Sequence, residues 1–167
     1  MKLSPGMSKY PIYALLENVR SLHNVGAIFR TADGAGVSKV YLTGITGQPP
    51  HREIRKVALG AEETVPWEYH ANSVELIEKL RRQQIQIVVL ESTLNSIQYD
   101  EAHYRFPLCL VVGHEYNGVS KEVIQKSDLL IRIPMKGVKI SLNVAVAFGI
   151  AIYEIVKQQR TAEEKDQ

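Results

Sequence analysis

Cysteine is almost absent from this sequence. Cys109 is the only one among 167 residues, which excludes an internal disulfide and a cysteine cluster for zinc. Because Cys109 lies in the apolar run PLCLVV, we expect a buried and unreactive thiol. The five histidines show no metal-ligand spacing with one another, so we predict no metal site.

Long hydrophobic runs are absent as well. No stretch approaches the roughly 20 apolar residues that a membrane-spanning helix needs. The N-terminus also lacks the apolar core of a signal peptide. These absences predict a cytoplasmic protein that does not reside in a membrane.

Two widespread catalytic motifs are missing too. No G-x-x-x-x-G-K-[ST] occurs, which argues against a P-loop NTPase. No G-x-S-x-G occurs, which argues against the usual α/β-hydrolase nucleophile. The glycines of DGAGVS follow a predicted helix rather than a strand, so we interpret them as a helix stop and not as a dinucleotide-binding loop.

What is present is the composition of an ordinary globular protein, with 45% hydrophobic and 23% charged residues. No repeat or linker divides the chain. We therefore predict a single domain over residues 1–167, with a core at about 11–160 and loose polar termini.

The charge is unevenly distributed. Residues 1–60 hold eight Lys and Arg against three acids, a balance of +5, whereas residues 61–128 hold six against eleven, a balance of −5. An anionic partner would therefore contact mainly the first third of the chain, although an unevenly charged solvated surface explains the same pattern.

Short β-rich runs alternate with helical patterns along the chain. The periodicity predicts strands at 11–16, 39–42, 65–70, 86–90, 108–112 and 129–134, and helices at 24–36, 51–59, 73–83, 120–127 and 142–159. This alternation predicts an α/β fold with a mostly parallel sheet flanked by helices. Ligands of such sheets bind beyond the carboxyl ends of the strands. Three polar or glycine-bearing clusters follow strand-like runs and are the candidate site.

The first cluster is NVGAIFR, residues 24–30. Asn24 begins the predicted helix, and helix capping alone would explain it. Gly26 lets another group approach the backbone closely. Arg30 lies at the edge of the buried helix face, where its guanidinium suits a phosphate; an exposed surface arginine is an equal alternative.

The second cluster is GHEYNGVS, residues 113–120, directly after a buried strand. Gly113, Glu115 and Gly118 predict a tight turn whose backbone groups can contact a flat heterocycle or a ribose. The alternative is an ordinary strand-to-helix loop in which Ser120 caps the next helix.

The third cluster is IPMKGVKISLN, residues 133–143. Gly137 permits an unusual backbone there, and either Ser141 or Asn143 can cap the last helix. That helix is apolar on more than one side, because residues 146–153 carry a second apolar stripe. We therefore predict a homodimer contact on this helix, with burial inside a single chain as the alternative.

Together, the three clusters resemble the three motifs of the SpoU/TrmH family, the 2′-O-ribose RNA methyltransferases of the SPOUT class. The first resembles N-x-G-x-x-x-R, the second G-x-E-x-x-G and the third I-P-M-x-G-x-x-x-S-L-N, in the same order along the chain. The likeness covers roughly residues 13–157. It implies a SPOUT fold, in which a C-terminal deep trefoil knot builds the cofactor pocket, an exception to the rule that chains avoid knots.

The resemblance also implies S-adenosyl-L-methionine as the cofactor and a homodimer whose site uses both chains. On that reading the cofactor-binding residues are Leu90, Glu91, Gly113, Ile133, Met135, Ser141, Leu142 and Asn143.

The implied reaction is methyl transfer to a ribose 2′-hydroxyl of structured RNA, with tRNA as the first choice. A ribosomal RNA methyltransferase and a catalytically silent RNA-binding dimer are the alternatives. The family assigns activation of the hydroxyl to the first-motif arginine, here Arg30. Because arginine is essentially always protonated, we expect Arg30 instead to clamp a phosphate and stabilise the developing alkoxide. The residues expected to orient the ribose and support Arg30 are Asn24, Glu115, Ser141 and Asn143.

Many family members carry an additional RNA-binding domain. We expect none here, so the catalytic domain itself would bind RNA. The candidate phosphate contacts, which carry no sequence information, are Arg20, Arg30, Arg52, Arg55 and Lys56.

Overall fold

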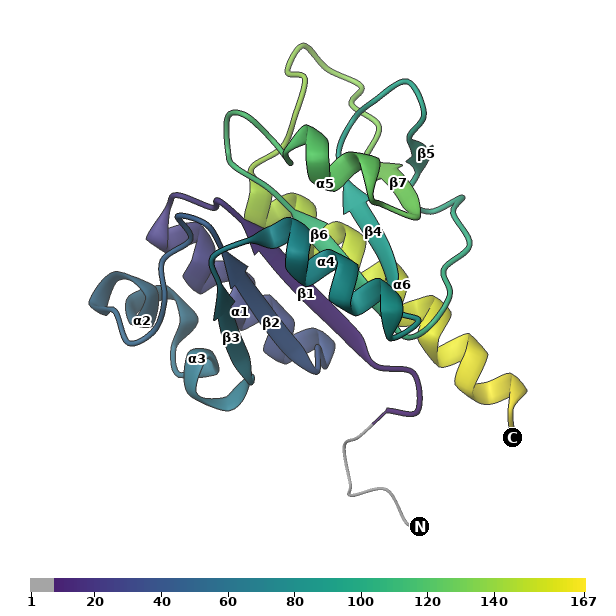
Figure 1. Ribbon diagram of the computed structural model, residues 1–167, viewed down its shortest axis with the longest axis horizontal. Coiled ribbons are helices and arrows are strands. Elements are labelled where there is room, and N and C mark those ends of the chain that lie inside the picture. The colour runs from purple at the N-terminus through teal and green to yellow at the C-terminus, as the bar shows by residue number, and fades with distance from the viewer. Residues whose placement is uncertain (1–7) are drawn as a thin grey trace.

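The computed structural model describes residues 8–167, which form an α/β fold around a seven-stranded parallel sheet (Figure 1). The strand order is β3-β2-β1-β6-β4-β7-β5, and every pairing is parallel. The strands are β1 (Ile12–Glu17), β2 (Lys39–Thr43), β3 (Trp67–His70), β4 (Gln86–Leu90), β5 (Ile97–Gln98), β6 (Leu108–Val112) and β7 (Leu129–Arg132). The predicted fold class is confirmed.

Helices cover both faces of the sheet (Figure 1). On one face α1 (Leu22–Ala35) and α6 (Val144–Lys165) bury Phe29 and Phe148, and α2 (Arg52–Ala58) and α3 (Ala61–Thr64) extend this layer. On the other face lie α4 (Ser73–Arg82) and α5 (Lys121–Gln125). None of the helices within residues 8–167 is long and apolar enough to cross a membrane.

The central strands β4 and β6 have the bounds that their apolar runs predict. Cys109 of β6 is fully buried, which confirms the predicted burial, and burial raises the pKa of its thiol.

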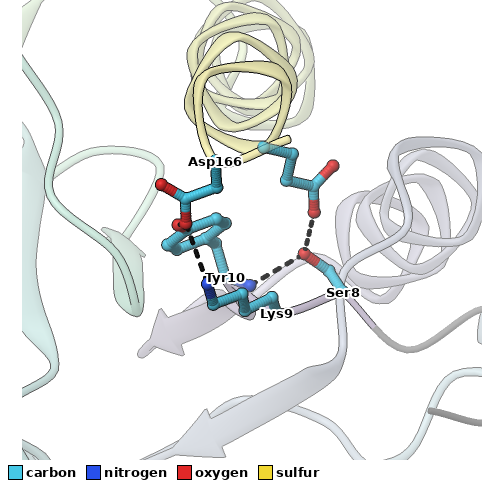
Figure 2. Close-up of polar contacts among 5 residues, drawn as sticks. Ser8, Lys9, Tyr10 and Asp166 are labelled. Atoms are coloured by element: carbon cyan, nitrogen blue, oxygen red, sulfur yellow. Dashed lines mark hydrogen bonds and ion pairs between the residues drawn. The ribbon is translucent and has the colours of Figure 1, made fainter. Parts of the chain in front are cut away.

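The C-terminal helix is longer than predicted. Because α6 runs to Lys165, the prediction of a loose tail at 161–167 is wrong. Ser8 donates a hydrogen bond to Glu163, and Lys9 Nζ lies 2.9 Å from Asp166 Oδ2 (Figure 2). The Tyr10 hydroxyl donates to the same Asp166 carboxylate. These contacts fasten the end of α6 to the chain just before β1. The predicted loose N-terminus falls mainly on residues 1–7, outside the described part of the chain.

Asn24 does not cap α1, contrary to the simplest sequence interpretation. The cap is Ser21, whose side chain accepts a hydrogen bond from the Asn24 backbone N–H at 3.2 Å. The Asn24 side chain is therefore free to contact other segments. The sequence equally suggests Ser73 as the cap of α4, but the cap is Asn72, whose side chain accepts a hydrogen bond from the Glu75 N–H.

Gly26 is required by helix packing. A Cβ on Gly26 would lie 2.6 Å from the Ile54 carbonyl oxygen, so α2 rests directly on α1 at this position. Gly137 differs, since it has no positive φ and a Cβ would meet open space. The expectation of an unusual backbone at Gly137 is therefore wrong.

Candidate functional site

A cavity of about 410 Å³ lies beyond the carboxyl ends of the neighbouring strands β6, β4 and β7. Its volume is within the roughly 300–1,000 Å³ typical of small-molecule sites. The segment before α6 closes it. Seven of the eight residues assigned to the cofactor by sequence line this one cavity: Leu90, Glu91, Gly113, Ile133, Met135, Ser141 and Leu142. The eighth, Asn143, does not line it.

The turn after β6 is held tightly. A Cβ on Gly113 would lie 2.5 Å from the carbonyl carbon and oxygen of Gly118, so a side chain cannot fit where the turn closes on itself. His114 and Gly118 exchange two backbone hydrogen bonds of 3.1 and 2.9 Å. Glu91, directly after β4, accepts a hydrogen bond from the Val119 N–H at 2.9 Å. This wall of the cavity is therefore preformed.

Glu115 connects this turn to the start of α1. Its carboxylate accepts hydrogen bonds from the backbone N–H groups of Arg20 and Ser21 at 3.0 and 2.9 Å and from Asn24 Nδ2 at 3.1 Å. Burial acts to raise its pKa, but the donors of Ser21, Asn24 and Arg20 together outweigh burial and hold the pKa of Glu115 below its usual value. Glu115 is thus a charged anchor at neutral pH and a weak proton acceptor.

Asn143 extends the connection to α6. Its Oδ1 caps the helix by accepting from the Ala145 and Val146 N–H groups at 2.9 and 3.2 Å. Its Nδ2 donates to Asn24 Oδ1 at 3.1 Å. Asn143 therefore both caps the helix and joins a polar chain, Glu115–Asn24–Asn143, that links segments of all three clusters. We call this chain the amide bridge.

Of the other sequence-predicted residues, Ser141 lies in the cavity wall, and Arg30 does not. Arg30 is exposed on α1, one helical turn after Ala27. The remaining basic candidates are also exposed. Arg52, Arg55 and Lys56 lie on α2, and the backbone N–H of Arg20 donates a hydrogen bond to Glu115.

Sequence reasoning missed residues that line the cavity or support the elements around it. Glu17 at the end of β1 is 2% exposed and accepts hydrogen bonds from Ser73 Oγ and from the Ser120 N–H and hydroxyl, which ties β1 to both helices of the opposite face. An acidic residue ending an apolar strand was the available signal. His114 and Tyr116 also line the cavity inside the second cluster. The place of His114 beside Glu115 suggests a catalytic residue as well as an ordinary loop histidine, whereas Tyr116 gave no signal of its own.

The side chains around the cavity suit S-adenosyl-L-methionine. The apolar side chains of Leu90, Ile133 and Leu142 can enclose a flat heterocycle, whereas the Glu91 and Glu115 carboxylates favour a positive charge. Within residues 8–167 no group of three or more His, Cys, Asp or Glu side chains could hold a metal ion.

A second hollow runs between α1 and α6 and is open to solvent. It is lined by Ala27, Thr31, Ala145, Val146, Gly149, Ile150 and Tyr153. We call it the α1–α6 groove. Val146 and Tyr153 are each 52% exposed in it, so the second apolar stripe of α6 is not buried by its own chain.

Comparison with known proteins shows that the chain is similar to RNA methyltransferases. The chain is 34% identical over 153 residues to the 23S rRNA (guanosine-2′-O-)-methyltransferase RlmB of Pseudomonas aeruginosa, covering 92% of this chain and 61% of that protein. It thus spans about three fifths of the length of such curated relatives.

Solved structures give the same result. The TrmH/SpoU tRNA modifying enzyme of A. aeolicus matches with a TM-score of 0.84 and 32% identity over 93% of this chain and 79% of that one. The AdoMet-bound rRNA methyltransferase of Sinorhizobium meliloti matches with a TM-score of 0.80 and 32% identity, covering 93% and 61%. The model of the SpoU rRNA Methylase family matches residues 11–153. Because this match spans most of the sequence, the chain belongs to the SpoU rRNA Methylase family.

Proposed function

We propose that this protein transfers a methyl group from S-adenosyl-L-methionine to a ribose 2′-hydroxyl of structured RNA. The observation that carries the proposal is the amide bridge, because it joins three segments distant in sequence beside a cavity of cofactor size. Such convergence of glycine turns and polar groups at the carboxyl ends of parallel strands is the usual setting of a ligand site.

The cofactor would be held by Leu90, Gly113, Ile133, Met135 and Leu142, with Ser141 in the wall that the segment before α6 forms. When bound, it supplies an electrophilic methyl group on a sulfonium. The chain's own residues would bring the ribose hydroxyl into line with that methyl group and exclude water from it.

Arg30 is the residue we assign to the reacting hydroxyl. Its guanidinium would clamp the adjacent phosphate and stabilise the developing alkoxide. Glu115 is a poor base because its pKa is lowered, so the hydroxyl proton would leave to phosphate or water. Asn24, Glu115, Ser141 and Asn143 would orient the ribose.

The active form would be a homodimer packed through the α1–α6 groove. This contact would cover the exposed apolar stripe of α6 and bring Arg30, which directly precedes the groove residue Thr31 on α1, toward the partner's cavity. Sedimentation at micromolar concentration tests the dimer, and a monomer there would contradict it. A C-terminal trefoil knot and a cytoplasmic location belong to the same proposal.

The RNA is proposed to be tRNA, contacted through Arg20, Arg52, Arg55 and Lys56, and the A. aeolicus neighbour, a tRNA modifying enzyme, supports this choice. Ribosomal RNA is the second candidate, because the P. aeruginosa relative is a 23S rRNA methyltransferase.

The test is transfer of labelled methyl groups to total RNA, followed by nucleoside mapping. We expect label in a 2′-O-methylated nucleoside of tRNA. Label in ribosomal RNA would favour the second candidate. Absence of transfer together with absence of cofactor binding in calorimetry would reject the proposed function.

A further inference from the structure

Tyr116 is an aromatic side chain at the mouth of the cavity that the proposed chemistry does not use. It lines the cavity next to Glu115, yet it is 93% exposed. The fold therefore does not need this ring for its core. An exposed ring that borders a ligand cavity is a candidate for a contact with substrate.

The backbone that carries Tyr116 is fixed. The His114 Nδ1 atom accepts hydrogen bonds from the Tyr116 and Asn117 N–H groups, each at 3.0 Å. The two backbone hydrogen bonds between His114 and Gly118 close the same turn. Only the torsions of the Tyr116 side chain remain free, so a ligand that contacts the ring would not have to order a loop first.

The ring lies next to a residue that we expect to help orient the nucleotide. Its neighbour Glu115 belongs to the amide bridge, which we expect to orient the ribose. A base attached to that ribose, or to the next one, extends outward from the cavity to the level of an exposed side chain. Ile140, which is 88% exposed, borders the cavity from the segment before α6 and adds apolar surface at the mouth.

We infer that the Tyr116 ring stacks on an unpaired base of the RNA, so that the protein selects a nucleotide in a single-stranded or loop segment over a paired one. This inference rests on the proposed function. Unpaired bases expose a flat face on which aromatic side chains stack, whereas bases in an A-form helix are already stacked on one another.

The test measures binding of three fluorescein-labelled probes by anisotropy: a short oligo(A), an abasic ribose-phosphate oligomer of the same length, and the corresponding RNA duplex. Stacking predicts that Tyr116→Ala weakens oligo(A) binding roughly 5- to 100-fold and leaves the abasic oligomer and the duplex within about twofold. Tyr116→Phe keeps the ring and should bind oligo(A) within about twofold of the wild type. Leu94→Ala is the control, because Leu94 is fully exposed and not aromatic.

Three results would overturn the inference. They are unchanged oligo(A) binding by Tyr116→Ala, an equal loss of binding to the abasic oligomer, or a Tyr116→Ala protein that sediments differently from the wild type, because the ring would then have a structural role. The proposed function fails separately. A wild-type protein that binds oligo(A) through Tyr116 but methylates no RNA would reject the function alone. A wild-type protein that methylates RNA while Tyr116→Ala binds oligo(A) normally would reject the stacking alone.

Discussion

The cofactor cavity and the α1–α6 groove differ in how far one chain completes them. The cavity has walls from three segments, held together by the amide bridge and by the turn at 113–118. The groove is apolar and open, with Val146 and Tyr153 half-exposed. Arg30, which precedes the groove residue Thr31 on α1, does not line the cavity. On our proposal, cofactor binding is therefore a property of one chain, whereas methyl transfer needs a second copy.

Arg30→Ala should give the largest effect and separate the two regions. Loss of the guanidinium removes the phosphate clamp and alkoxide stabilisation, so we expect transfer to fall at least about 100- to 1,000-fold. Cofactor affinity should stay within about twofold, because Arg30 does not line the cavity. Labelled methyl transfer and calorimetry measure the two quantities.

Arg52→Ala is the matched comparison for Arg30. Arg52 is exposed on α2, and we expect its loss to raise KM for RNA while leaving kcat nearly unchanged. If Arg30→Ala methylates RNA at the wild-type rate, Arg30 does not have the role that we assign to it.

Glu115→Ala should damage the cavity side. The change leaves two backbone N–H groups and the Asn24 amide without their acceptor, so we expect a loss of about 1–3 kcal/mol in unfolding free energy. Transfer should fall roughly 10- to 100-fold, since the residues around the ribose are no longer held in place. Urea unfolding and steady-state kinetics measure both. Glu101→Ala, at an exposed turn, is the control and should behave as the wild type.

Asn143→Ser separates the cap of α6 from the amide bridge. Serine is as good a cap as asparagine, so stability should remain within about 0.5 kcal/mol, whereas Asn143→Ala should cost about 1 kcal/mol. Both variants lose the donor to Asn24, and we expect both to transfer methyl roughly tenfold more slowly. Full activity of Asn143→Ser would mean that Asn143 is only a cap.

Acid should have the smallest effect. Because the pKa of Glu115 is lowered in the folded protein, its carboxylate stabilises the fold above the pKa of the unfolded chain, and this stabilisation is lost as pH falls through the folded value. The difference in Tm between the wild type and Glu115→Gln should therefore shrink once the pH falls below roughly 4, where a free glutamate titrates. A difference that stays constant at lower pH would argue against the anchoring role.

The sequence predicted the fold class well where the pattern was long or continuous. The apolar runs of β4 and β6 have no alternative to burial, so their bounds were correct. The two-residue β5 and four-residue α3 are too short to show a period and were missed. The strand order was also beyond the pattern, because periodicity identifies strands and not their neighbours.

The sequence predicted seven residues that line the cavity, but not the hydrogen bonds that connect the three clusters. Asn24 and Ser21 can both cap a helix, so residue type alone did not decide between them. Only the structure shows that the helix uses Ser21. The hydrogen bonds of Glu115 to the Arg20 and Ser21 backbone leave no trace in residue type. On our proposal Arg30 acts at the partner's cavity, and the sequence of one chain carries no sign of a contact between two copies.

The most direct test of the account is complementation between two impaired variants, Arg30→Ala and Asn143→Ala, mixed after unfolding and refolding together. If Arg30 acts on the partner's cavity, each mixed dimer has one site with both residues intact. Random mixing then makes half of the dimers mixed, so activity should recover to about a quarter of the wild-type value. Activity no higher than that of the separate variants would contradict the account, because it would mean that Arg30 serves the cavity of its own chain.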